Sequence, residues 1–358
     1  MKKFLCLLLG LCMMVSLFAC GGTEGPEGTS GSDTAQGSDT AQGTDATQGT
    51  DGTNAGTASD SNDPAQVSNL VLATDQKQER LVVYDMDILE PGDSLDLAEI
   101  WSYDIGEPYI AGLKYREDTV FGDVILAVGD DAYMISYPEK ELLWHCTDPG
   151  KNPHCIDILP NGDIVIALAL NGDAVRLFNT SVLAKGGSEE DALKFAEVPL
   201  PDCHGVLYDP EEDVIWALGQ DDLIGLAYSN NGTPSLTHLM NSGAYIAHIG
   251  IGGHSLSVDL SNPNYLYLTG WNNVIRFDKK AQKVEKVKAL FDIGNVKGFG
   301  INRNGNAVRC FPDGESTYGW RTHTIQYYDK VGGAKEFESY TSANSEFYKV
   351  VLFDGKYQ

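Results

Sequence analysis

The chain has few basic residues, and it lacks the short motifs that mark common enzyme classes. Its 358 residues include 25 Lys and Arg against 51 Asp and Glu, for a formal net charge of −26. So acidic a surface repels phosphate backbones, and we expect no nucleic-acid partner. No Gly-x-Ser-x-Gly, Walker or His-Glu-x-x-His motif occurs in the sequence. Nothing therefore favours a serine hydrolase, a P-loop NTPase or a zincin.

Cysteines in zinc-cluster or redox spacing are also lacking. None of the seven cysteines forms a Cys-x-x-Cys pair, which argues against both kinds of site. Four cysteines lie beyond the N-terminal segment, at Cys146, Cys155, Cys203 and Cys310. Cys146 and Cys155 are the closest pair and are candidates for a disulfide, with buried free thiols as the alternative.

Long hydrophobic runs are absent except near the N-terminus. An apolar run over 4–18 follows two lysines, and it is too short to be a good membrane span. It ends in Leu17–Cys20, which reads Leu-Phe-Ala-Cys and resembles the lipobox of bacterial lipoproteins, with Phe as a bulky departure. The resemblance implies a signal peptide over 1–19, a lipid on Cys20, and a protein anchored to the bacterial cell envelope on its extracytoplasmic side. An ordinary secretory signal is the alternative, and it also predicts export.

The next stretch, 20–65, has too few apolar side chains for a core. The hexapeptide Ser-Asp-Thr-Ala-Gln-Gly occurs at 32–37 and again at 38–43. This Gly, Thr and Asp-rich composition predicts a disordered linker after the lipidated cysteine. The remainder, 66–358, is long enough for one large folded domain.

The domain consists of short strand-like runs separated by turn residues. One unit repeats: a basic residue, an alternating segment, a polar turn and a second apolar run. In one copy these are His254, the turn 262–264 and the run 265–270. A third strand and a weaker fourth strand follow, at the spacing of propeller blades, about 40–50 residues. The basic residues that open the six units are Lys114, His154, His204, His254, Lys297 and Lys349.

The two ends of the domain together complete one blade. The segment from Lys349 reads as a first strand with no partner after it, whereas 69–74, 80–85 and 97–103 read as second to fourth strands with no first. Joining them predicts an all-β, six-bladed β-propeller closed by strands from both termini, which removes open sheet edges. The domain thus resembles the six-bladed propellers of exported bacterial lipoproteins, without the Gly-His and Trp-Asp signature of WD40 repeats.

The six basic residues are predicted to form a ring at one channel mouth, because first strands line the channel of a propeller. Three interpretations remain open. The ring could bind an anion by charge. Its three histidines could hold a divalent metal. The side chains could instead cap the apolar layer between blades, since Leu256 and Val258 share strand parity with His254.

Further residues on the same predicted face suit an acidic sugar. Trp271 and Trp320 would stack on its ring, and Arg321 would pair with its carboxylate. The favoured function is therefore binding of an anionic ligand, such as an acidic glycan, by a tethered monomer. A protein-interaction scaffold is one alternative. Another is a polysaccharide lyase acting on uronate-containing glycans, with a general base whose pKa is lowered by mutual repulsion, chosen from His154, His204 and His254.

Overall fold

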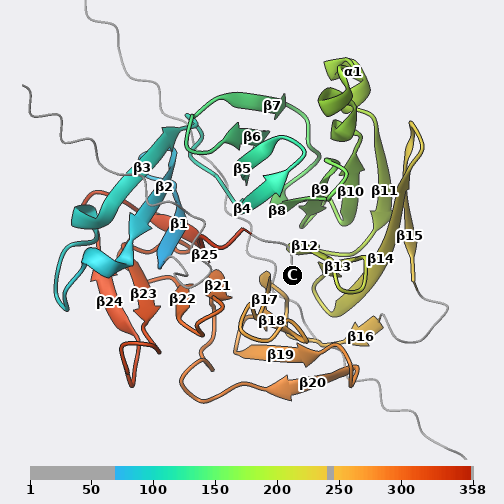
Figure 1. Ribbon diagram of the computed structural model, residues 1–358. Helices are drawn as coiled ribbons and strands as arrows, with labels where there is room; N and C mark the ends of the chain where they lie inside the picture. Colours follow the sequence, from blue (N-terminus) through green and yellow to red (C-terminus); the bar gives the residue numbers. More distant parts are fainter. Residues whose placement is uncertain (1–68, 240–245, 356–358) are drawn as a thin grey trace, which may run out of the picture. The chain divides into compact units, whose positions relative to one another are not determined.

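The structure is a computed structural model that describes residues 69–239 and 246–355. These residues form six β-sheets arranged as the blades of a propeller (Figure 1), which confirms the predicted fold class. The predicted signal peptide, the predicted lipidation site Cys20 and the predicted linker lie outside the described residues. Among the described residues, no helix is long and apolar enough to cross a membrane.

Each blade is an antiparallel sheet whose first strand lies nearest the centre of the ring (Figure 1). Blade 1 consists of β25 (Phe347–Leu352), β1 (Leu70–Asp75), β2 (Arg80–Asp85) and β3 (Glu99–Asp104). Blade 2 consists of β4 (Gly112–Thr119), β5 (Gly122–Val128), β6 (Ala132–Ser136) and β7 (Leu142–Cys146). Blade 3 consists of β8 (Pro153–Ile158), β9 (Ile164–Leu168), β10 (Ala174–Phe178) and β11 (Phe195–Pro199).

The other three blades follow in chain order. Blade 4 consists of β12 (Gly205–Asp209), β13 (Val214–Leu218), β14 (Asp222–Asn230) and β15 (Pro234–His238), and the short β16 (Ile246–His248) also pairs with β14. Blade 5 consists of β17 (Ser255–Val258), β18 (Tyr265–Thr269), β19 (Val274–Asp278) and β20 (Lys283–Lys286). Blade 6 consists of β21 (Gly298–Ile301), β22 (Ala307–Cys310), β23 (Thr324–Tyr328) and β24 (Glu338–Thr341).

The ring closes where strands from the two ends of the domain pair. β25 runs antiparallel to β1, with Val71 opposite Leu352 and Ala73 opposite Val350. The main-chain NH of Lys349 also donates a hydrogen bond to Thr74 Oγ1 at 2.9 Å. Blade 1 is therefore built from both ends of the domain, as the sequence predicted.

Burial explains why the inner strands were easier to recognise than the outer ones. Every residue of β9 and of β13 is buried, because neighbouring blades cover both faces of each second strand. Such strands read as continuous apolar runs instead of alternating ones. The fourth strand β20 has the sequence Lys-Val-Glu-Lys and no buried residue. Its pattern is weak because it lies at the outer edge of a blade.

The core is divided into six clusters, one at each interface between neighbouring blades. Between blades 4 and 5, for example, Trp216 and Phe277 pack with ring centroids 5.7 Å apart. All four cysteines of the described region are free thiols, so Cys146 and Cys155 form no disulfide. Each blade is held mainly by the apolar faces of its neighbours.

Blade 3 carries an excursion between its third and fourth strands. It contains the 3₁₀ helix η3 (Thr180–Lys185) and the short helix α1 (Glu189–Ala192), whose N-terminus is capped by the Ser188 side chain. Figure 1 shows this segment at the outer side of the blade, beside β10 and β11. It therefore lies away from the first strands that surround the channel.

Candidate functional site

Side chains from blades that are not neighbours meet in the central channel. Nζ of Lys349, on β25 of blade 1, donates a hydrogen bond at 2.6 Å to the main-chain oxygen of His254, which precedes β17 of blade 5. The Tyr348 ring of blade 1 lies 6.2 Å, between centroids, from the His154 ring of blade 3. Because each contact skips one blade, these side chains lie in the channel rather than at a blade interface.

The three histidines form a continuous row across blades 3, 4 and 5. The His154 and His204 ring centroids are 4.5 Å apart, and those of His204 and His254 are 4.8 Å apart. The His254 ring then meets the edge of Trp271 at 5.1 Å. The three histidines occupy equivalent positions in consecutive blades, and their rings therefore form one continuous row.

Main-chain contacts determine the tautomer of two of these histidines. Nδ1 of His154 lies 3.0 Å from the Asn152 oxygen, and Nδ1 of His204 lies 3.0 Å from the Asp202 oxygen. A carbonyl oxygen only accepts, so each Nδ1 carries the ring proton. Each Nε2 therefore presents a lone pair. The Asp202 carboxylate lies 3.5 Å from Nδ1 of His204 and adds to this preference.

The histidine row is uncharged at neutral pH. Burial lowers the pKa of His154 to about 3, with a further contribution from His204. Burial likewise lowers the pKa of His204 to about 4, and the positive charges of Lys349 and Lys297 contribute to this shift. Burial also lowers the pKa of His254 strongly. Desolvation is thus the main cause, and repulsion between basic groups, which the sequence suggested, is secondary.

Two lysines complete the cluster and carry its charge. Nζ of Lys297 lies 2.8 Å from Nε2 of His254 and 5.1 Å from the Trp271 ring centroid. Lys297 is 4% exposed and Lys349 6% exposed. Within 69–239 and 246–355, neither ammonium group has a carboxylate oxygen within 4.0 Å. Burial, the largest cause, lowers the pKa of each lysine to about 8.

His254 has an unusual hydrogen-bonding state. If the Lys297 ammonium donates to its Nε2, the ring proton must lie on Nδ1. That Nδ1 is buried and has no hydrogen-bond partner in the part of the chain that the structure describes. Buried polar atoms are nearly always paired. The cluster therefore has unsatisfied positive charge and an unsatisfied polar atom side by side.

Lys114 takes part in a different cluster from the other five basic residues. Its Nζ lies 3.3 Å from Asp157 Oδ2 and 3.3 Å from the Val206 oxygen. Arg116 binds the same carboxylate with two hydrogen bonds of 2.9 and 2.8 Å. Asp157 is fully buried. Burial by itself would raise the pKa of its carboxyl, but Arg116 and Lys114 outweigh burial and lower the pKa.

The register of the first strands explains this displacement. The main-chain NH of Lys297 bonds to the Cys310 oxygen, and the NH of Ala111 makes the matching bond to the Val128 oxygen. Ala111, three residues before Lys114, therefore occupies the ring position of blade 2. The β4–β5 hairpin is irregular near its turn, with a register shift between Arg116 and Thr119, and this moves the basic residue of blade 2 away from the ring position.

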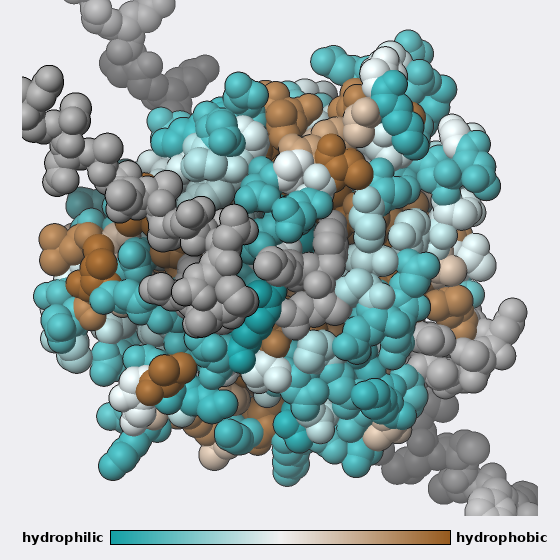
Figure 2. All heavy atoms as spheres, viewed as in Figure 1, coloured by the Kyte–Doolittle hydropathy of each residue, from teal (hydrophilic) through white to brown (hydrophobic). Residues whose placement is uncertain are grey.

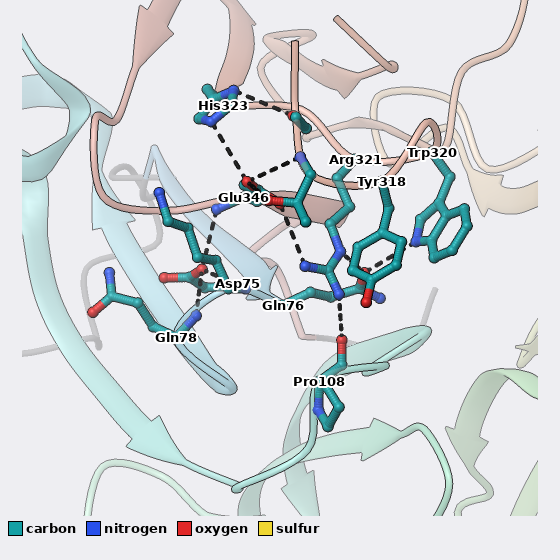
Figure 3. A network of polar contacts seen from close by, with 12 residues as sticks. Asp75, Gln76, Gln78, Pro108, Tyr318, Trp320, Arg321, His323 and Glu346 are labelled. Atoms are coloured by element: carbon teal, nitrogen blue, oxygen red, sulfur yellow. Dashed lines mark hydrogen bonds and ion pairs between the residues drawn. The ribbon is translucent and has the colours of Figure 1, made fainter. Parts of the chain in front are cut away.

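Arg321 lies in a buried network that connects three blades (Figure 3). Its Nε donates to Gln76 Oε1 at 2.7 Å, its Nη2 to the Pro108 oxygen at 2.8 Å, and its Nη1 to Glu346 at 3.3 Å. Arg321 is 4% exposed, and its guanidinium packs under the Tyr318 ring at 4.3 Å. Glu346 balances its charge, so the contacts favour a structural role over binding of a ligand carboxylate.

The two predicted tryptophans remain accessible on the surface. Trp271 is 60% exposed beside the histidine row, and Trp320 is 39% exposed. Trp320 stacks on Tyr318 with centroids 4.8 Å apart and an interplanar angle of 22°, and Tyr318 also contacts Tyr109. Each tryptophan therefore offers an exposed flat face. On the side shown in Figure 2, hydrophilic residues predominate and hydrophobic residues form separate patches.

The described residues contain no group of three or more His, Cys, Asp or Glu arranged to hold a metal ion. The hydrogen bonds of the histidine row give the reason. Nδ1 of His154 and of His204 is used as a donor, and Nε2 of His254 contacts Lys297. The three rings thus do not present three free lone pairs to one point.

Comparison with known proteins supports the fold and goes no further. No protein-family model matches the sequence, and no curated protein matches it. The structure is similar to that of a protein of unknown function from Bacteroides caccae, with a TM-score of 0.52, 12% sequence identity, and coverage of 80% of this chain and 100% of that one. A functionally unknown protein from Desulfotomaculum acetoxidans has a TM-score of 0.49, 10% identity and the same coverage.

Proposed function

We propose that the propeller binds an anionic ligand at the channel mouth through Lys297 and Lys349. The observation that supports this function is the approach of both buried ammonium groups to His254 with no carboxylate within 4.0 Å among the described residues. A buried charge without a partner is costly. A ligand carboxylate would accept charge-assisted hydrogen bonds and offset that cost.

The surroundings of the lysines favour an acidic sugar as the ligand. Trp271 is largely exposed and lies beside both His254 and Lys297. Its indole face suits the apolar face of a pyranose ring, while the two ammonium groups suit a carboxylate on that ring. A uronic acid has both features.

We also propose that the domain works outside the cytoplasm on a lipid anchor at Cys20. The support for this is the Leu17–Cys20 tetrapeptide and the Gly-rich segment 20–65. A flexible chain of that length reaches about 35–40 Å. Metabolic labelling with a radioactive fatty acid tests the anchor, and equal labelling of Cys20→Ser and wild type would exclude it.

Calorimetric titration of the full chain with galacturonate and with galactose tests the anion site. We expect galacturonate to bind and galactose to bind at least tenfold more weakly, about 1.4 kcal/mol. Lys297→Met and Lys349→Met should each lose a similar factor. The matched control is Lys280→Met, because Lys280 is exposed. Equal affinity in the wild type and all three variants would overturn the proposal.

A lyase acting at the same site is a second candidate, because two neutral histidines stand beside the lysine charges. His154 and His204 each present an Nε2 lone pair that could take the proton next to a uronate carboxylate. The ammonium groups would stabilise the charge that develops on that carboxylate. The unsaturated product absorbs in the ultraviolet. Absorbance that rises with wild type and not with His204→Gln supports this activity, and a flat trace over a panel of uronate polymers removes it.

A further inference from the structure

We infer that Lys297 forms a covalent imine with a small carbonyl compound that carries a carboxylate, the chemical class of 2-oxo acids. The inference comes from the juxtaposition of Lys297 Nζ, His254 Nε2 and Lys349 Nζ. Recognition of the carboxylate rests on the proposed anion site. The reaction of the amine does not rest on the anion site, because the amine could also form an imine with an uncharged aldehyde.

Lys297 has the surroundings that make a lysine nucleophilic. An amine attacks a carbonyl only when it is unprotonated, and both desolvation and a neighbouring cation favour that state. Lys297 is buried against the Trp271 ring, and Lys349 approaches the same histidine from blade 1. Burial lowers the pKa of Lys297 to about 8, so a substantial fraction is a free amine in mildly alkaline solution.

The contacts with His254 assign different roles to the two lysines. Lys297 lies 2.8 Å from Nε2, whose lone pair accepts a hydrogen bond from the amine and orients the nitrogen. Lys349 instead donates to the main-chain oxygen of His254. Lys297 also lies beside the exposed Trp271 ring, so we assign the reaction to Lys297 and the holding of the carboxylate to Lys349.

The chemistry balances without an oxidant or a metal. The Lys297 nitrogen adds to the carbonyl carbon, a C–N bond forms, and the π electrons move to oxygen, which takes a proton. The nitrogen loses its extra proton to solvent water, which balances the proton that the oxygen takes up. Loss of water from the resulting carbinolamine gives the C=N bond. Overall one amine and one carbonyl yield one imine and one water.

Two thiols lie near the lysines and must be distinguished from them. Cys155 and Cys310 both lie close to Lys349. Burial raises the pKa of Cys310 to about 12, so it stays a thiol. A thiol adds reversibly to a carbonyl to give a hemithioacetal. Hydride reduction of an imine, in contrast, gives a stable secondary amine, so trapping by borohydride reports lysine alone.

The experiment is reductive trapping on the full chain. The protein is incubated with pyruvate and sodium cyanoborohydride, digested, and analysed by peptide mass spectrometry. We expect the adduct on Lys297 to exceed that on exposed Lys280 in the same sample by at least tenfold. This internal comparison needs no variant. Equal labelling of the two lysines would overturn the inference, and so would unchanged total labelling in a folded Lys297→Met variant.

Two further arms separate the imine from the anion site. Lys349→Met should lower labelling by pyruvate about tenfold more than it lowers labelling by acetaldehyde. Selective acetaldehyde labelling of Lys297 with no loss of pyruvate labelling in Lys349→Met supports the imine and contradicts the anion site. Galacturonate binding without any Lys297 adduct contradicts the imine and supports the anion site. His254→Leu removes the acceptor and should slow labelling of Lys297, and His254→Gln, whose amide oxygen can accept the hydrogen bond, should restore part of the rate. An unchanged rate in His254→Leu would remove His254 from the reaction.

Discussion

Nζ of Lys349 lies 2.6 Å from the main-chain oxygen of His254, a contact that crosses the channel from blade 1 to blade 5. It brings a charge from the strand that closes the ring to the histidine that also contacts Lys297. The buried ammonium groups of Lys349 and Lys297 gain no stability from an ion pair with a carboxylate among the described residues. The channel mouth should therefore respond to pH and to anions more strongly than the rest of the fold.

The two lysines should make stability rise with pH in mildly alkaline solution. Their pKa values are about 8 in the folded state against 10.5 for an ordinary lysine, so the unfolded chain binds more protons between these values. The free energy of unfolding then increases with pH. We expect a gain of about 2 kcal/mol for each lysine between pH 7.5 and 9.5, measured by urea denaturation.

The double variant Lys297→Met/Lys349→Met is the control for this effect. It should lose the alkaline gain and be more stable than wild type at pH 7, because an unpaired buried charge has been replaced by an apolar chain. Galacturonate at saturating concentration should flatten the wild-type profile, since the ligand restores the lysine pKa values. A wild-type slope identical to that of the double variant would show that the lysines are solvated.

The histidine row should make the protein sensitive to mild acid. His204 has a pKa of about 4 in the folded state and 6.5 ordinarily, so stability is lost as the pH falls from 6.5 towards 4. His204→Gln should remove roughly 2 kcal/mol of that loss. Denaturation series at pH 7 and pH 4.5 measure it. His145→Gln, at an exposed position of β7, should keep the wild-type difference.

Asp157 should be essential for stability, because its buried carboxylate on β8 pairs with two basic side chains of the neighbouring strand β4. Asp157→Asn removes the charge that pairs with Arg116 and Lys114. Breaking a buried ion pair by removing one charge costs about 3–5 kcal/mol. Thermal unfolding should show a fall of many degrees. The surface pair Asp191–Lys194 provides the control, and Asp191→Asn should leave the melting temperature unchanged.

Arg321 should matter for stability and not for the ligand. Arg321→Met leaves Glu346, which is 2% exposed, without its cationic partner, and we expect a loss of about 3 kcal/mol. Arg321→Met/Glu346→Gln should recover part of it. Galacturonate affinity, measured below the unfolding temperature, should equal that of wild type. A tenfold loss of affinity would instead place Arg321 in the binding site.

Local sequence patterns predicted the strands and most of the cluster. Predicted strands such as 80–85 and 265–270 match β2 and β18 to within one residue, because these largely buried strands are mostly apolar. Five of the six basic residues meet as expected. Lys114 does not join them, because the β4–β5 hairpin is irregular and spacing in the sequence does not reveal the resulting shift in register. The partner of Arg321 was missed because Glu346 is distant in sequence and no local pattern marks it.

The sequence alone determined that this is an acidic, all-β, six-bladed propeller whose ends share a blade, because strand period and repeat spacing are local properties. Only the tertiary structure decided which basic groups are charged. Burial makes the row of His154, His204 and His254 neutral, and it encloses Lys297 and Lys349 with no carboxylate oxygen within 4.0 Å among the described residues. Desolvation depends on what surrounds a side chain in space, and the chain order does not contain that information.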